Sequence, residues 1–190
     1  MEYGEIRTME GDTIISPASP RLRVRIDPTL IYLGDLQYLL HQTNRVQEFV
    51  FIDVNSLGHV TRIMLVQFQG FLESKVGKYD HPVHQTVRLS GQEYLYDVFF
   101  INLPEYIAAH PESEIARAAD YIRQRAYTLS GDVVYQRFLR LVDAENRNQM
   151  IIAYMERNED QALTTEAIQK DKAAAKLLLE RALNRFSILK

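Results

Sequence analysis

The sequence predicts an α+β protein: an antiparallel β-sheet of about five strands with one inserted helix, followed by a mainly helical C-terminal half. Two apolar runs, at residues 49–52 and 63–68, flank a loop that contains Asn55, Ser56 and Gly58. This pattern is typical of a β-hairpin. After Gly131 the chain contains neither proline nor glycine. The absence of both strong breakers favours helix in the C-terminal part.

The length of 190 residues predicts one domain or two small ones, and a single domain, residues 1–190, is favoured. Residues 1–20 read as a mostly irregular segment. Residues 21–102 form the sheet-rich half, and residues 103–190 form the helix-rich half, which ends in a long amphipathic helix at 164–189. Because the hairpin is apolar on both faces, we expect both halves to share one core.

Residues 21–26 alternate between arginine and aliphatic side chains. This predicts a half-buried strand whose arginines share one face. Such a ridge could contact phosphate or an acidic partner. The favoured interpretation is an edge strand whose charges discourage sheet-to-sheet association. The ridge consists of Arg21, Arg23 and Arg25.

The next segments divide into a predicted helix and four predicted strands. Asp27-Pro28 resembles a helix N-cap followed by proline at the first helical position. Leucines then recur at helical spacing, so we expect a helix over 28–43. The hairpin follows as the centre of the sheet, and strands are expected at 84–89 and 94–101.

The C-terminal half begins at Asn102, an expected N-cap for a short helix that runs to about Ala109. An apolar stripe predicts a second helix within 112–127. Helix is favoured over strand for 132–145, and residues 149–156 fit either. The last helix is expected to open at Thr164 and to run nearly to the end of the chain.

The composition excludes several classes of protein. The chain has no cysteine, so disulfides, thiolate metal sites and a cysteine nucleophile are excluded. The net charge of -3 argues against nucleic acid as a partner, and no apolar run is long enough to cross a membrane. The N-terminus does not resemble a signal peptide, so we expect a cytoplasmic protein. No nucleotide-binding, dinucleotide-binding, serine-hydrolase or zinc-protease motif occurs, so no cofactor is expected and enzyme activity stays open.

The aromatic side chains of the predicted strands are candidates for a ligand pocket between sheet and helices. The alternative, which is favoured, is that they fill the core. Asp97 interrupts an apolar strand and could act as a base; otherwise it faces outward or forms an ion pair, with Arg62 as a candidate partner. The pocket candidates are Phe49, Phe51, Phe68, Tyr94, Tyr96, Asp97 and Phe100.

His81 and His84 are the nearest approach to a metal cluster, because imidazole is a common zinc ligand. The proline between them rules out the helical spacing of a histidine pair, so a solvated loop is favoured.

One side of the terminal helix could pair with a second copy of the chain or dock on its own sheet. The self-association candidates are Leu178, Leu179, Ala182, Phe186 and Leu189. The expected function is a non-catalytic interaction or regulatory module that forms a homo-oligomer or binds another protein. The alternative is a protein or enzyme that binds a small apolar ligand in an aromatic-lined pocket.

Overall fold

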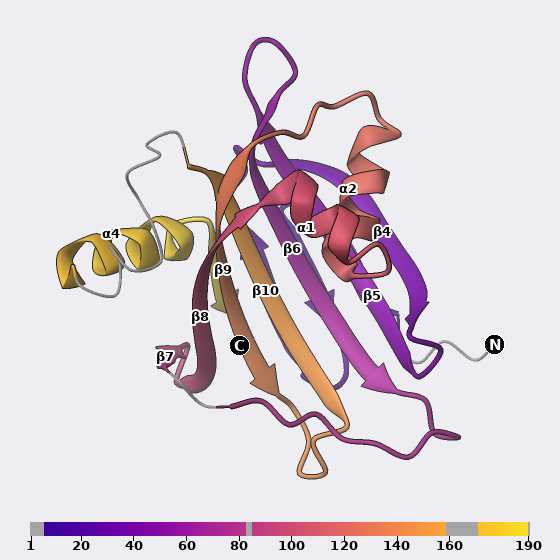
Figure 1. Cartoon of the computed structure of the whole chain (residues 1–190). Coiled ribbons are helices and arrows are strands. Elements are labelled where there is room, and N and C mark those ends of the chain that lie inside the picture. Colours follow the sequence, from indigo (N-terminus) through magenta and orange to yellow (C-terminus); the bar gives the residue numbers. More distant parts are fainter. Residues whose placement is uncertain (1–5, 83–84, 159–170, 190) are drawn as a thin grey trace.

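The computed structural model describes residues 6–82, 85–158 and 171–189 (Figure 1). Most of the chain forms two antiparallel sheets. The larger sheet has the strand order β4-β5-β6-β10-β9-β8-β7 and the smaller has the order β1-β2-β3-β11. The strands of the large sheet are β4 Ile31–Leu40, β5 Asn44–Val54, β6 Val60–Phe71, β7 Thr86–Leu89, β8 Gln92–Asn102, β9 Asp132–Leu141 and β10 Asn148–Arg157. Those of the small sheet are β1 Thr8–Glu10, β2 Thr13–Ser16, β3 Leu22–Ile26 and β11 Phe186–Leu189.

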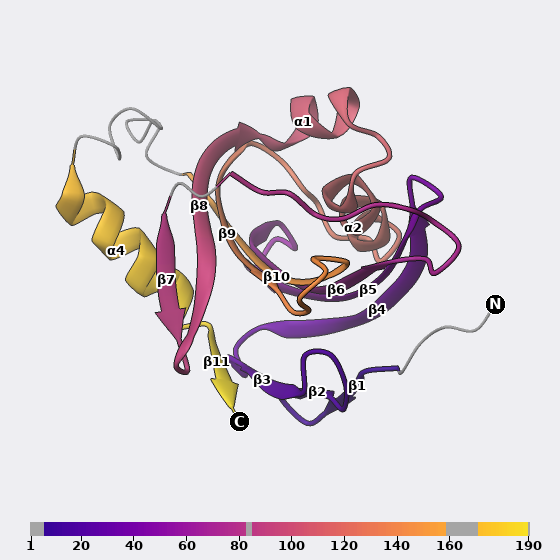
Figure 2. The same cartoon turned by 90° about the horizontal axis from the view of Figure 1, so that it is seen from below.

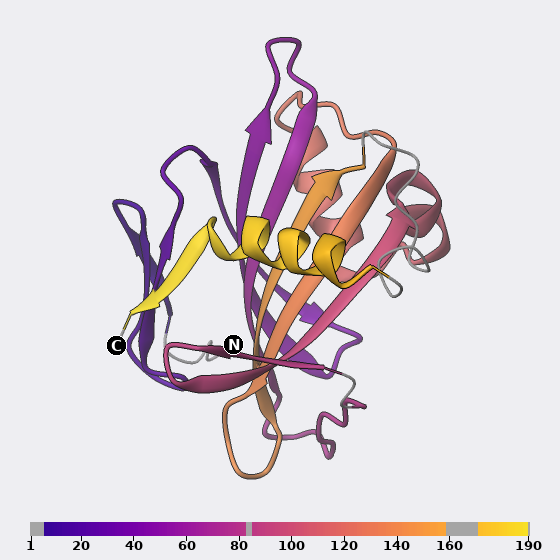
Figure 3. The same cartoon turned by 90° about the vertical axis from the view of Figure 1, so that its left-hand side faces the viewer.

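In the described part of the chain, three helices cover parts of the large sheet. The helices α1, Leu103–Ala109, and α2, Glu114–Arg123, lie on its concave face, and the strands curl around α2 (Figure 2). The helix α4, Lys172–Leu183, crosses the opposite, convex face (Figure 3). The small sheet lies against the rest of the convex face (Figure 2). The molecule therefore has three layers, with the large sheet in the middle.

The middle layer explains why the hairpin is apolar on both faces. Phe49 and Phe51 belong to the core between the two sheets, whereas Val50 and Ile52 pack toward α1 and α2. All four are buried, and β5 pairs with β6 along its whole length. The predicted hairpin and its interior position are therefore confirmed.

The predicted fold class is wrong, because the protein is mostly β and its C-terminal half is not mainly helical. The predicted helix over 28–43 is instead the edge strand β4. A β-bulge lies between Tyr32 and Gly34, where the pairing with β5 shifts by one residue. The bulge places residues three apart on the same face, which imitates helical spacing.

The predicted helix over 132–145 is also wrong, since this segment forms β9. The undecided residues 149–156 lie in β10, which pairs with both β6 and β9. A strand in the middle layer buries both of its faces, so its apolar residues do not alternate cleanly. The sequence pattern therefore could not separate strand from helix.

The terminal helix is shorter than predicted. Thr164, its expected start, lies outside the described residues, and α4 ends at Leu183. The following residues form β11, which pairs with β3. The chain thus returns to its own N-terminal strands and completes the small sheet.

Candidate functional site

The aromatic pocket candidates fill the core between the two sheets. Phe49, Phe51, Tyr94 and Tyr96 are buried there. Phe68 packs with them and also reaches the wall of a small hollow of about 190 Å³. Phe100 packs against Val134 and Leu178 under α4. These side chains thus behave as core, and the aromatic-lined pocket between sheet and helices stays a prediction.

Asp97 points to the other face of the sheet, where it meets an arginine on β9. The Arg137 guanidinium donates to one carboxylate oxygen of Asp97 through Nε at 3.0 Å and Nη2 at 2.5 Å. Arg62, the partner considered from sequence, instead pairs with Asp53. The charge of Asp97 is therefore matched by an ion pair within the sheet.

The histidines do not assemble a metal centre in the described part of the chain. His81 Nε2 lies 2.7 Å from Gln149 Oε1, and its ring stacks on Tyr79. His84 is outside the described residues. Within residues 6–82, 85–158 and 171–189, no group of three or more His, Cys, Asp or Glu side chains could hold a metal ion.

The self-association candidates mostly face their own chain. Leu178, Ala182 and Phe186 are buried, and Leu179 packs against the inter-sheet core. Leu189 lines a cleft, described next. Self-association through this side stays a prediction, but little of its apolar surface is exposed.

An open cleft of about 900 Å³ lies where the two sheets diverge. One wall consists of the end of β2, the loop between β2 and β3, the start of β3 and the end of β11. The other wall comes from the β7–β8 turn and the end of β9. The lining residues are Ile15, Ser16, Pro17, Ala18, Ser19, Pro20, Arg21, Leu22, Arg23, Ser90, Gln92, Arg140, Val142, Ile188 and Leu189.

The cleft combines an apolar surface with positive charge. Both walls contribute arginines, with Arg21 and Arg23 next to β2 and Arg140 on the large sheet. None of the described lining residues is acidic. By contrast, Arg25 on the same strand as Arg23 pairs with Asp12 at 3.8 Å. Local positive charge is thus concentrated in the cleft of a protein whose net charge is negative.

Arg140 also lies beside a buried tyrosine. The Tyr94 hydroxyl has no hydrogen-bond partner of good geometry in the described structure. Burial raises the pKa of Tyr94, and the nearby Arg140 guanidinium partly offsets that rise. A guanidinium is a donor and a phenolic oxygen can accept, so Tyr94 can support Arg140 from the core side.

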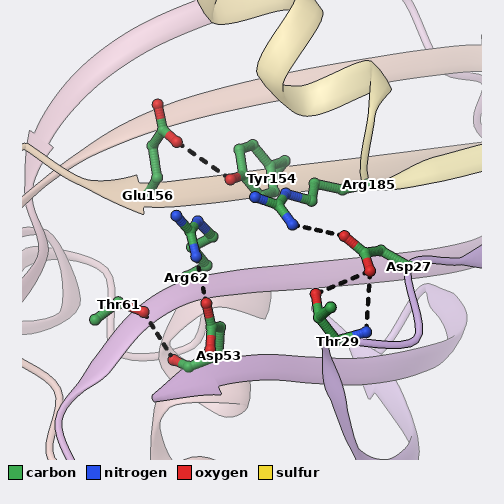
Figure 4. Close-up of polar contacts among 8 residues, drawn as sticks. All are labelled: Asp27, Thr29, Asp53, Thr61, Arg62, Tyr154, Glu156 and Arg185. Carbon is green, nitrogen blue, oxygen red and sulfur yellow. Dashed lines mark hydrogen bonds and ion pairs between the residues drawn. The ribbon is translucent and has the colours of Figure 1, made fainter. Parts of the chain in front are cut away.

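An ion pair attaches the start of β11, which forms part of the cleft wall, to the residue that follows β3 (Figure 4). Arg185 Nη1 lies 2.6 Å from Asp27 Oδ2, at the start of β11. On α4, Arg181 Nη1 lies 2.8 Å from Glu156 Oε1. Hydrogen bonds from Thr29 and Arg185 lower the pKa of Asp27, although burial alone would raise it. These contacts attach β11 and α4 to the body of the protein.

The concave face carries a second polar cluster, the glutamine chain, which consists of Glu48, Gln67, Gln69 and Gln149. Gln67 donates to Glu48 Oε1 at 2.7 Å, Gln69 donates to Gln67 at 2.9 Å, and Gln149 donates to Gln69 at 2.7 Å. Burial is the main cause that raises the pKa of Glu48 to about 8. All four side chains are buried, and Gln69 is the member of this chain that also reaches the small hollow of about 190 Å³.

Sequence reasoning identified the ridge on β3 but missed Arg140. Arg140 and Phe138 are two residues apart and therefore share a face of β9. Phe138 lies in the inter-sheet core, and Arg140 lies at the edge of that core, where the cleft begins. Reading residues 132–141 as a strand would have placed Arg140 on the same face as Val134 and Phe138.

The chain matches no protein-family model, and searches of curated proteins and of solved structures found no significant similarity. Within the described residues, none of the helices has the length and apolar character to cross a membrane.

Proposed function

We propose that the protein binds a small amphipathic anion in the cleft between its two sheets. One observation carries the proposal: three arginines from opposite walls line a cleft that is otherwise largely apolar and that has no acidic lining residue among those described. Ligand sites typically combine an apolar surface with a few converging polar groups. The volume of about 900 Å³ lies within the usual range for such sites.

The lining residues indicate a ligand with an apolar part and an acidic head group. Ile15, Leu22, Val142 and Ile188 offer aliphatic surface to an apolar chain or ring. The arginines favour a carboxylate or phosphate, because a guanidinium matches the paired oxygens of either group. A long-chain carboxylate is the simplest molecule with both features.

The strand order argues against edge protection as the role of the arginine ridge. From sequence, the ridge was best explained as protection of an edge strand. In the structure β3 lies between β2 and β11, so it is an interior strand of the small sheet. Edge protection therefore does not account for Arg21 and Arg23, and their exposure leaves both guanidinium groups accessible to an anion.

The test is calorimetric titration of the full chain with dodecanoate below its micelle-forming concentration. We expect saturable binding of one dodecanoate per chain. The double variant Arg21→Gln/Arg23→Gln should weaken binding about tenfold or more, since it removes two of the three charges in the cleft.

Arg25→Gln is the matched control, because Arg25 lies on the same strand and is exposed but does not line the cleft. It should leave the affinity for dodecanoate unchanged. Absence of binding to the parent protein, or an equal loss in the control, would contradict the proposal.

A further inference from the structure

The three arginines of the cleft are not equivalent. Arg21 and Arg23 are exposed, whereas Arg140 is partly buried. Arg140 lies on the middle layer of the protein, where β9 pairs with β8 and β10. An ion pair strengthens as water is excluded from it, so a head group on Arg140 is held more strongly than one on the exposed arginines.

The Tyr94 side chain adds a second feature to the deep wall. Its hydroxyl is buried beside Arg140 but lacks a hydrogen bond of good geometry. A buried polar group without a partner is unfavourable, so a small adjustment of Arg140 that completes this contact is favoured. Tyr94 does not itself line the cleft, and it can act on a ligand only through Arg140.

The remaining lining continues from this wall toward solvent. Val142 lies two residues after Arg140, and Ile188 of β11 also belongs to the lining. An apolar chain can follow these residues while its acidic end stays on the deep wall. The opposite orientation would place the apolar end against a guanidinium, which costs desolvation without a partner.

We infer that Arg140 is the residue that selects the ligand by charge: the acidic head group binds at the deep wall on Arg140, with Tyr94 as a positioning residue behind it. The inference rests on the proposed function. Carboxylate and phosphate share the required chemistry, and the test includes both.

The test compares three ligands with the same apolar chain, namely dodecanoate, dodecyl phosphate and dodecanol. Their affinities are measured on the parent protein, on Arg140→Gln and on Arg21→Gln/Arg23→Gln, each below the concentration at which the ligand aggregates. The parent should bind at least one of the two acids about tenfold or more tightly than dodecanol. Arg140→Gln should lose more of that preference than Arg21→Gln/Arg23→Gln does, and it should keep the affinity for dodecanol.

Three further variants separate selection from folding. Arg140→Lys keeps the charge and should retain part of the preference. Tyr94→Phe should reduce the preference about threefold without changing dodecanol binding, because it removes one hydrogen-bonding group. Arg88→Gln changes an exposed arginine of β7, in the hairpin that also contains Tyr94, and Arg88 does not line the cleft. It should change neither the affinities nor the preference for the acid. Thermal melts check that each variant is folded.

The outcomes distinguish this inference from the proposed function. If the parent binds none of the three ligands, both are overturned. If Arg140→Gln loses no more of the preference for the acid than Arg21→Gln/Arg23→Gln does, the exposed arginines select the charge and the inference alone is overturned. An equal loss of affinity for the acid and dodecanol would show a structural role for Arg140 and would overturn the inference as well.

Discussion

Glu48 is a fully buried carboxyl group in the glutamine chain, between the large sheet and α2. Its immediate polar neighbours are Gln67 and the Tyr38 hydroxyl, which donates to Oε2 at 3.2 Å. On α2, the negative charge of Glu114 raises the pKa of Glu48 and the positive charge of Arg117 lowers it. Burial dominates and raises the pKa to about 8, so the folded protein holds a proton there at neutral pH.

This raised pKa predicts how stability depends on pH. Between the ordinary pKa of 4.5 and the folded value of about 8, the folded state binds more protons at Glu48 than the unfolded state. The stabilisation that protonated Glu48 gives to the folded state is fully present below pH 4.5 and is lost as pH rises through 8. Its upper limit is roughly 5 kcal/mol. Glu48→Gln should flatten this part of the curve, as measured by urea denaturation across the same pH range.

The comparison uses the difference between the two proteins, because all other titrating groups are common to both. Glu48→Gln keeps the size of the side chain and its contact with Gln67. If the two curves run parallel between pH 4.5 and 8, Glu48 is already ionised in the folded protein and the assignment fails.

At the scale of elements, ion pairs add to the strand pairing and packing that attach β11 and α4 to the sheets. The Arg185–Asp27 pair is largely shielded from water, with 25% and 14% of the two side chains exposed. Removing one partner of a shielded pair leaves the other charge without compensation. The same pair fixes the start of β11, which forms part of the cleft wall.

Arg185→Ala should therefore lower the free energy of unfolding by about 3 kcal/mol and increase amide hydrogen exchange along β11. Lys176→Ala is the control, since Lys176 and Glu180 form an exposed pair on α4 that should contribute well under about 1 kcal/mol. A small effect of Arg185→Ala, similar to that of the control, would show that β11 is held by packing alone.

The elements also show where sequence reasoning succeeds and where it fails. The strand β3 and the N-cap at Asn102 were predicted, because alternation and capping are local chemistry. Asp27 was predicted as a helix cap; it does accept a hydrogen bond from the Thr29 backbone, but the chain continues into a strand. The β-bulge in β4 and the double burial of β9 depend on neighbouring strands, so no local pattern reveals them.

The candidate site has the same limits. Arg21 and Arg23 could be singled out because they alternate with aliphatic residues. Arg140 and Ile188 could not be joined to them, because β9 and β11 reach the cleft only through the folded topology. Arg140 was hidden further by the expectation of a helix at 132–145.

At the scale of the whole molecule, the cleft follows from the unequal size of the two sheets. The small sheet has four short strands and cannot cover the convex face of seven strands. Part of the remaining face is covered by α4 (Figure 3). The seam near the β7–β8 turn is left as the cleft. Because its two walls belong to different layers, a bound anion would join the small sheet to the large one.

A ligand that joins the sheets should raise the stability of the whole protein. Dodecanoate at about 100 times its dissociation constant is expected to add about 2.7 kcal/mol to the free energy of unfolding. Thermal melts at increasing dodecanoate concentration measure this gain. The Arg21→Gln/Arg23→Gln variant should need about ten times more ligand for the same shift, and an equal response of parent and variant would contradict binding in the cleft.

The most direct measurement is a titration of the ¹⁵N-labelled protein with dodecanoate, followed by two-dimensional amide NMR spectra. Binding in the cleft predicts that the largest shift changes lie at the amides of Arg21, Arg23, Ser90, Arg140, Ile188 and their neighbours in the lining. A spectrum that stays unchanged up to the micelle-forming concentration would contradict the proposed function. So would changes centred on α2 and the glutamine chain of the concave face.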